Sequence, residues 1–180
     1  MIKGIIFSII LIFISIFVFG GNRLISLRSE YINNFKHIAG EISIYSRATD
    51  IWGQGHNLIV LINRATNNTN ITENLSNALN VLDTKLKNID NNTNFAILYE
   101  KLTDVINEIN ILNRTRDTLN IESVHSGMDG IIANVNSSYN IIRNSSFNNM
   151  SNAFNETRNM FPANIISIFR GVRNIEYFGE

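Results

Sequence analysis

An uninterrupted apolar run near the N-terminus constrains this chain more than any other feature of its sequence. The residues from Ile5 to Phe19 are apolar apart from two serines, and the stretch from Gly4 to Asn22 carries no charged side chain. A bilayer core about 30 Å thick is crossed by roughly 20 residues of α-helix at about 1.5 Å per residue. We therefore predict a single transmembrane helix, which anchors the chain through residues 1–22.

A second interpretation of the run is a cleaved signal peptide, because Lys3 precedes an apolar core of suitable composition. Val18 and Gly20 form a weak cleavage signal, but no Ala-x-Ala pattern follows them. The helical apolar pattern also continues past the run without a break. We therefore favour a retained anchor over a cleaved peptide.

The charges that flank the run predict its orientation. Lys3 lies on the N-terminal side, whereas Arg23, Arg28 and Lys36 follow on the other side. Lys and Arg are enriched on the cytoplasmic side of membrane spans. We therefore expect a single-pass protein of the cell membrane, with its N-terminus outside and its C-terminal domain in the cytoplasm.

Composition limits what residues 23–180 can do. They are numerous enough for one domain with a hydrophobic core. The 15 Lys and Arg residues balance the 15 Asp and Glu residues, so no basic excess favours nucleic acid. The absence of cysteine excludes disulfides, thiol catalysis and Cys-ligated zinc. A single proline favours long helices, because proline breaks helix interiors.

Apolar residues recur at steps of three and four along most of this domain, which is the helical period. The predicted segments are a helix that continues from the anchor to about Thr49, a break at 53–55, a short helical piece at 58–62, a helix at 71–89, a helix at 95–116 with the cleanest heptad-like seam, a loop at 126–130 and a long helix from Ile132 to Phe161. Four long amphipathic segments without a strand signal predict an all-α fold, with an antiparallel four-helix bundle after the transmembrane helix.

Local signals refine the ends of these helices. Asn70 with Glu73 resembles a capping box, and the polar loop at 91–94 supplies a cap for the helix that follows. Phe161 precedes a proline and is pushed out of helical geometry. Pro162 is expected to open a short helix, and Gly171 to end it.

Candidate chemistry is sparse in this sequence. His37 and Glu41 lie four residues apart on one helix face and could share a metal ion, but no second ligand pair accompanies them. We therefore favour a surface or packing pair. No Ser/His/Asp set, Gly-rich phosphate loop or nucleotide fingerprint occurs. The sequence predicts no enzyme, no cofactor, no metal and no small-molecule substrate.

An aromatic residue followed by asparagine occurs three times, at Tyr139-Asn140, Phe147-Asn148 and Phe154-Asn155. Spacings of eight and seven keep the aromatic residues near one helix face. One interpretation is an aromatic core in a chain rich in asparagine. The other is a row of asparagines that bond across helices and fix their register.

The closing stretch continues this pattern through Phe161-Pro162-Ala163-Asn164, Gly171 and the pair Tyr177-Phe178. Its order resembles the closing signature of the LemA family. The stretch from Asn22 to Arg28 and the helix that follows Asn94 are similar to two further motifs of that family. The positions that carry the resemblance, which we expect to be structural, are Asn22, Leu24, Leu27, Arg28, Phe95, Phe147, Asn148, Phe154, Asn155, Phe161, Pro162, Asn164, Gly171, Tyr177 and Phe178.

The chain departs from the family pattern in its middle loops. Arg47, Asp50-Ile51 and Asn57-Leu58 are what remain of one motif, and the stretch from Asp117 to Ser138 is expanded. The resemblance implies a membrane helix with a short outer N-terminus, a cytoplasmic antiparallel four-helix bundle and no assigned catalytic residues. A relative in magnetotactic bacteria is linked to forming magnetosome membranes, which suggests membrane organisation by analogy.

Two function hypotheses follow from these features. The first is a non-catalytic scaffold, interaction or membrane-organising protein, whose partners are the membrane and either other proteins or further copies of itself. The second is a sensory or ligand-binding helical bundle outside the cytoplasm, which would require the opposite orientation or a cleaved anchor.

Overall fold

The computed structural model describes residues 2–37, 43–66, 68–119 and 122–179, and all regular secondary structure in these ranges is helical. The α-helices are α1 (Ile2–Lys36), α2 (Ile44–Thr66), α3 (Glu73–Lys87), α4 (Phe95–Thr115), α5 (Glu122–Arg143), α6 (Phe147–Asn159) and α7 (Ala163–Arg170). Two short 3-10 helices are η1 (Thr69–Thr72) and η2 (Arg116–Leu119). The prediction of an all-α fold is confirmed.

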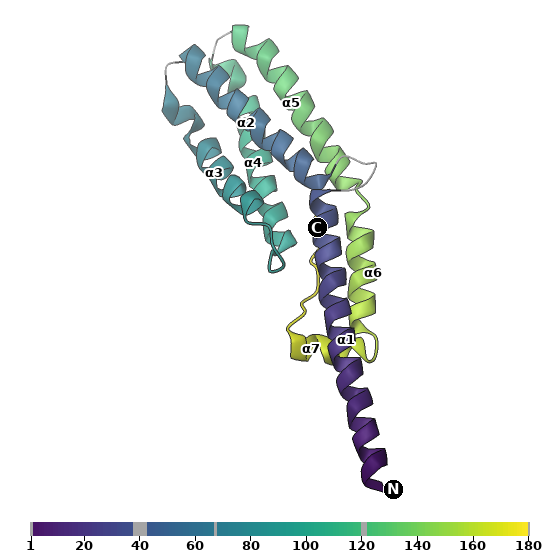
Figure 1. Cartoon of the computed structure of the whole chain (residues 1–180). Coiled ribbons are helices and arrows are strands. Elements are labelled where there is room, and N and C mark those ends of the chain that lie inside the picture. Colours follow the sequence, from purple (N-terminus) through teal and green to yellow (C-terminus); the bar gives the residue numbers. More distant parts are fainter. Residues whose placement is uncertain (1, 38–42, 67, 120–121, 180) are drawn as a thin grey trace.

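The helices make four antiparallel passes along one long axis (Figure 1). α1 and α2 together form the first pass, α3 the second, α4 the third, and α5 with α6 the fourth. α2, α3, α4 and α5 pack together at one end, whereas α6 and α7 pack on α1 at the other. The first part of α1 projects beyond the rest of the molecule, and it contains the predicted anchor.

The core follows the helical period that the sequence predicts. In α4, six apolar residues at steps of three and four are at most 5% exposed, namely Phe95, Leu98, Leu102, Val105, Ile109 and Leu112. α3 contributes a matching stripe of Leu75, Leu79, Leu82 and Leu86. Removing apolar surface of this extent from water is the main force that holds the bundle together.

The first helix differs from its prediction, because it does not continue to Thr49. α1 ends at Lys36, and α2 begins at Ile44 with the Ser43 hydroxyl accepting the main-chain N–H of Ser46 at 3.1 Å. Serine caps a helix start in this way, so the chain begins a new helix at this point. Residues 38–42, which the predicted helix includes, lie outside the described residues. The predicted domain boundary at residue 22 lies within α1, which passes through it unbroken.

The two breaks predicted at glycines are wrong. Residues 53–55 lie inside α2, and residues 126–130 lie inside α5. A Cβ atom at Gly55 would lie 2.8 Å from Cδ2 of Leu79 in α3, and one at Gly127 would lie 2.9 Å from Cδ2 of Leu61 in α2. These glycines therefore allow neighbouring helices to approach closely, and they do not end the helices that contain them.

The long last helix is also interrupted, since residues 144–146 separate α5 from α6. The Asn144 side chain donates to the main-chain oxygen of Asn140 at 2.9 Å. Asparagine and serine bond the local backbone in this way and favour helix ends over helix interiors. The polar Asn-Ser-Ser stretch thus divides the fourth pass at a point that the apolar periodicity does not reveal.

Of the predictions for the helix ends, one is wrong and the others are confirmed. Thr72 and not Asn70 precedes α3, so the predicted capping box is wrong, and Asn68 instead accepts the N–H of Asn70 at the start of η1. Asn94 caps α4 as expected, because its side chain accepts the N–H of Ile97 at 3.0 Å. α7 follows Pro162 and ends at Gly171, whose positive φ of 63° suits glycine.

The close approach at Gly55 gives a testable prediction. Gly55→Ala and Gly53→Ala each gain about 1 kcal/mol of helix propensity in α2. A Cβ atom at Gly53 meets no atom within 4 Å, whereas the one at Gly55 meets the buried Leu79. Overpacking of this kind costs about 1–3 kcal/mol. Guanidinium unfolding of the full chain in mild detergent should find Gly55→Ala less stable than Gly53→Ala by this amount. Equal stabilities would contradict the close packing of α2 on α3.

Candidate functional site

Most of the motif residues predicted from the sequence gather where α1 meets α6, α7 and residues 171–179, which we call the C-terminal tail. The tail contains no helix, and it runs back beside α1 from α7 toward the junction of α1 and α2 (Figure 1). Its direction is opposite to that of α6. The site therefore joins the part of α1 that follows the apolar run to the C-terminal tail.

Two asparagines of α6 hold the tail by its main chain. The Asn155 amide donates to the oxygen of Ile175 and accepts the N–H of the same residue, both at 2.9 Å. The Asn148 amide does the same with Phe178, at 3.1 Å and 2.8 Å. An asparagine side chain has one acceptor and one donor group, so each amide satisfies both main-chain groups of one tail residue.

The spacing of these contacts explains why they form together. Asn148 and Asn155 are separated by seven helical residues, or about 10.5 Å at about 1.5 Å each. Ile175 and Phe178 are separated by three residues, which span about 10 Å in an extended chain. A shift of the tail by one residue would break both pairs of hydrogen bonds, so the two amides fix its register on α6.

These contacts bear on the two interpretations of the aromatic-asparagine pairs. Asn148 and Asn155 do fix a register, but their partner is the extended tail and not another helix. The third pair differs, because Asn140 is exposed. Its neighbour Tyr139 shares a hydrogen bond of 2.6 Å between its hydroxyl and that of Tyr99.

The aromatic members of the pattern form the apolar side of the junction. The Phe35 ring of α1 lies 4.8 Å from Phe95, 5.3 Å from Phe147 and 5.0 Å from Phe178, measured between ring centroids. All four side chains are at most 1% exposed. Such ring pairs add about 0.5–1.5 kcal/mol beyond their buried area. This cluster therefore joins α1, α4, α6 and the tail.

Two further aromatic contacts extend this cluster. Phe154 is 1% exposed, and its ring lies 5.6 Å from that of Tyr31 in α1. The Tyr99 ring lies 5.3 Å from that of Phe178. Burial and the hydrogen bond to Tyr139 raise the pKa of Tyr99 to about 12, so this hydroxyl stays protonated to a higher pH than that of an exposed tyrosine, whose pKa is about 10.

Arg28 makes the polar link between α1 and the rest of the junction. It is 6% exposed, and its Nε donates to the oxygen of Arg173 at 3.2 Å. One terminal nitrogen donates to the oxygen of Asn174 at 3.4 Å, and the other donates to the oxygen of Asn91. A single buried guanidinium thus joins α1, the tail and the loop between α3 and α4. Lys36 adds a further bond to this loop, at 2.9 Å to the oxygen of Ile89.

The remaining motif positions lie around this centre. Leu24 is buried and Leu27 is half-buried against the core. Asn22 accepts a hydrogen bond of 2.7 Å from Arg170 at the end of α7. Tyr177 donates its hydroxyl proton to Asn152 in α6. Phe161, Pro162 and Asn164 form the corner between α6 and α7, where Phe161 is 79% exposed and Asn164 donates its N–H to Met160.

Sequence reasoning missed three contributors to the junction. Arg158 donates from Nε to the oxygen of Val172 at 2.8 Å and so extends the tail contacts along α6. Gly20 and Gly21 bring α7 onto α1, because a Cβ atom at Gly20 would lie 2.9 Å from Cδ1 of Ile166 and one at Gly21 would clash with Arg170. The signal was the adjacent glycine pair at the end of a run of bulky residues.

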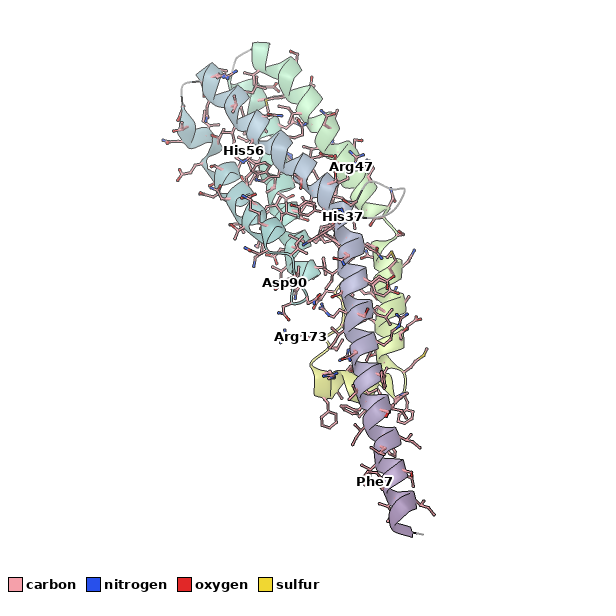
Figure 2. All side chains as sticks on the ribbon, in the orientation of Figure 1. Phe7, His37, Arg47, His56, Asp90 and Arg173 are labelled. Atoms are coloured by element: carbon pink, nitrogen blue, oxygen red, sulfur yellow. The ribbon has the colours of Figure 1, made fainter. Side chains whose placement is uncertain are left out.

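Two of the histidines, His37 and His56, lie apart from each other (Figure 2). His37 at the end of α1 and His56 within α2 lie at different levels of the molecule (Figure 2). Glu41, the other half of the predicted pair, lies outside the described residues. The His56 ring packs 4.4 Å from Trp52, and Nε2 of His125 lies 3.3 Å from the oxygen of Arg116. Within the described ranges, no group of three or more acidic or histidine side chains could hold a metal ion.

Two surface hollows of the described chain lie at this junction, one of about 100 Å³ beside Arg28 and Arg173 and one of about 330 Å³ beside Asn148 and Tyr177, and others lie away from it. One of about 300 Å³ lies at the turn between α3 and α4, and one of about 470 Å³ lies beside η1. Threonine and asparagine line much of both.

Comparison with protein-family models, with curated proteins and with solved structures found no match. The function must therefore be argued from the contacts of the chain itself.

The asparagine contacts give a matched prediction. Asn148→Ala and Asn155→Ala each leave a main-chain N–H and oxygen of the tail unpaired, and Asn140→Ala removes an exposed amide from the same sequence pattern. An unpaired buried group costs about 1–3 kcal/mol, whereas exposed substitutions stay within about 0.5 kcal/mol. We expect this difference in chemical unfolding of the full chain in detergent. A neutral Asn155→Ala would show that the tail is not held by this side chain.

Proposed function

We propose that this chain is a membrane-anchored helical-bundle protein of the LemA type, which acts as a non-catalytic scaffold at the cell membrane. The observation that supports it most is the first part of α1. This helix is long and apolar enough to cross a membrane. Only 6% of its most apolar stretch of 18 residues is buried within the structure. A core helix of a water-soluble protein would be mostly buried, so exposed side chains such as Phe7 and Phe13 favour lipid surroundings.

A retained anchor is also favoured over a cleaved signal peptide. α1 passes from the apolar run into the core without interruption. Phe17 packs on Phe169 with their ring centroids 5.4 Å apart, and Gly20 lies against Ile166. Cleavage after Gly20 would therefore cut a helix whose side chains on that turn already contact α7.

The scaffold role is supported by how the polar side chains at the junction are used. Arg28, Asn148 and Asn155 each donate to main-chain oxygens of the chain itself. These groups stabilise one arrangement of the helices, which suits a rigid support for other molecules. The same three residues are positions of the LemA-like pattern, and their meeting at one junction supports that assignment.

The partners that we propose for this scaffold are the membrane and either other proteins or further copies of the chain. The proposed location has the N-terminus outside and the bundle in the cytoplasm, because Arg23, Arg28 and Lys36 follow the apolar run.

Orientation is tested with reporters fused after Glu180. Alkaline phosphatase, which is active only outside the cytoplasm, should be inactive there, and a fluorescent protein that folds in the cytoplasm should fluoresce. The same reporters fused before Met1 serve as the matched control and should give the opposite result. An active phosphatase after Glu180 would contradict the cytoplasmic bundle and favour an extracytoplasmic sensory or ligand-binding protein.

The anchor itself is tested by deletion. Removing residues 1–16 takes away most of the apolar run and leaves Phe17, Gly20 and Gly21 to pack on α7. We expect alkaline carbonate to release this variant from membranes, while the full chain stays in the membrane pellet. Circular dichroism should still show a helical fold. Retention in the pellet would show that residues 1–16 are not the anchor, and loss of helix would show that the bundle depends on them.

A further inference from the structure

The corner between α6 and α7, together with α7 itself, carries the most exposed of the large apolar side chains outside the predicted anchor. Phe161 is 79% exposed, Ile168 and Phe169 are each 74% exposed, and Met160 is 63% exposed. In the described chain after Phe19, the other exposed large apolar side chains reach at most 49%, at Ile111. Clusters of this kind on a protein surface mark contact with another molecule or with a membrane.

The exposed side chains of α7 share one face. Ile165, Ile168 and Phe169 follow the i, i+3, i+4 spacing that places residues together on a helix. Ile166 and Ser167 on the opposite face are buried, at 3% and 1% exposed. α7 is therefore packed on its inner face and leaves an apolar outer face, on which the contact of the Phe169 ring edge with Phe17 leaves Phe169 still 74% exposed.

The position of α7 along α1 indicates what covers this face. α7 contacts α1 at Phe17 and Gly20 and through the hydrogen bond from Arg170 to Asn22. These residues lie about 20–27 Å along α1 from Gly4, at about 1.5 Å per residue. A bilayer core is about 30 Å thick. If α1 spans the bilayer, α7 therefore lies at the level where the span reaches the membrane surface.

The direction of α7 fits this level. α7 lies across α1 and not along it (Figure 1). A span that follows the bilayer normal would thus hold α7 roughly in the plane of the membrane surface. Helices that bind in this plane bury an apolar face among the acyl chains and carry basic residues beside it.

The charged residues near α7 are those expected beside a helix that lies in the membrane surface. Between Glu156 and Glu176, every charged residue is an arginine, namely Arg158, Arg170 and Arg173. Arg170 and Arg173 are exposed, as is Arg23 where α1 leaves the apolar run. Arginine side chains at this height suit anionic lipid headgroups.

We propose that α7 and the adjoining corner form a second membrane contact, in which Phe161, Ile168 and Phe169 insert into the interfacial region of the bilayer that α1 crosses. This proposal rests on the proposed anchor. The lipid surface is favoured over a second protein because the exposed face continues the apolar surface of the span and lies beside exposed arginines. Two contacts would fix the height and the rotation of the bundle above the membrane.

The test uses tryptophan as a reporter of lipid contact in the full chain. The one native tryptophan is changed by Trp52→Phe, and single tryptophans are then introduced by Phe169→Trp, Phe13→Trp or Ile111→Trp. Each variant is reconstituted in vesicles of phosphatidylcholine and phosphatidylglycerol, with or without bromine in the upper acyl chains. Quenching by bromine reports lipid contact, and quenching by acrylamide in the buffer reports contact with water. Phe161→Trp is a second reporter of the corner if Phe169→Trp alters the fold by circular dichroism.

We expect the emission from position 169 to be strongly quenched by brominated lipid, while that from Ile111→Trp on α4 is quenched by acrylamide instead. Phe13→Trp reports the anchor separately and should also be quenched by brominated lipid. Acrylamide quenching at position 169 equal to that at position 111 would overturn the proposal, because α7 would then face water. Protection from both quenchers would overturn it in favour of a protein partner or a second copy. A position 13 that lipid does not quench would instead contradict the anchor and with it the proposed function.

Discussion

The arrangement of α1, the C-terminal tail and the loop between α3 and α4 depends on the hydrogen bonds of the buried Arg28 guanidinium. A buried cation is costly unless its hydrogen-bonding groups are satisfied. Arg28 is satisfied by main-chain oxygens of Asn91, Arg173 and Asn174, which come from two segments far apart in the sequence. α1 therefore cannot slide or rotate without leaving this charge unpaired. Because the same helix extends into the apolar run, Arg28 fixes the position of the bundle relative to the part of the chain that we propose to cross the membrane.

The C-terminal tail completes this link from the other end of the chain. Asn148 and Asn155 hold it in one register on α6, and the Phe178 ring enters the aromatic cluster beside Phe35. The tail starts directly after α7, at Gly171. α7, the tail, α6 and α1 are thus joined in a closed set of contacts, so α7 keeps its place across α1. A rigid connection of this kind suits a protein whose proposed role is to hold a helical surface at a defined distance from a bilayer.

The features that the sequence predicts correctly are those with a local cause. The seam of α4 follows from apolar spacing, and the limits of α7 follow from Pro162 and Gly171. The errors at the two glycines have a different origin, which lies outside the helices that contain them. Gly55 and Gly127 resemble helix breaks unless the neighbouring helix is known, because their role is to admit Leu79 and Leu61. The partner of the α6 asparagines also escapes a search for periodicity, since the tail is extended. Seven helical residues and three extended residues span nearly the same length, which indicates the tail as the partner of these asparagines. This comparison can be made only when the fold is known.

Hydrogen exchange of the full chain in phospholipid vesicles tests the central claim most directly, which is that one helix passes from the membrane into a junction closed by the tail. The account predicts that amides of α1 stay protected without a gap from the apolar run to Tyr31, because that helix is continuous. It also predicts slow exchange at Ile175 and Phe178, whose N–H groups donate to asparagine side chains. Rapid exchange between Gly20 and Leu24, or a tail that exchanges as fast as an unstructured peptide, would contradict it.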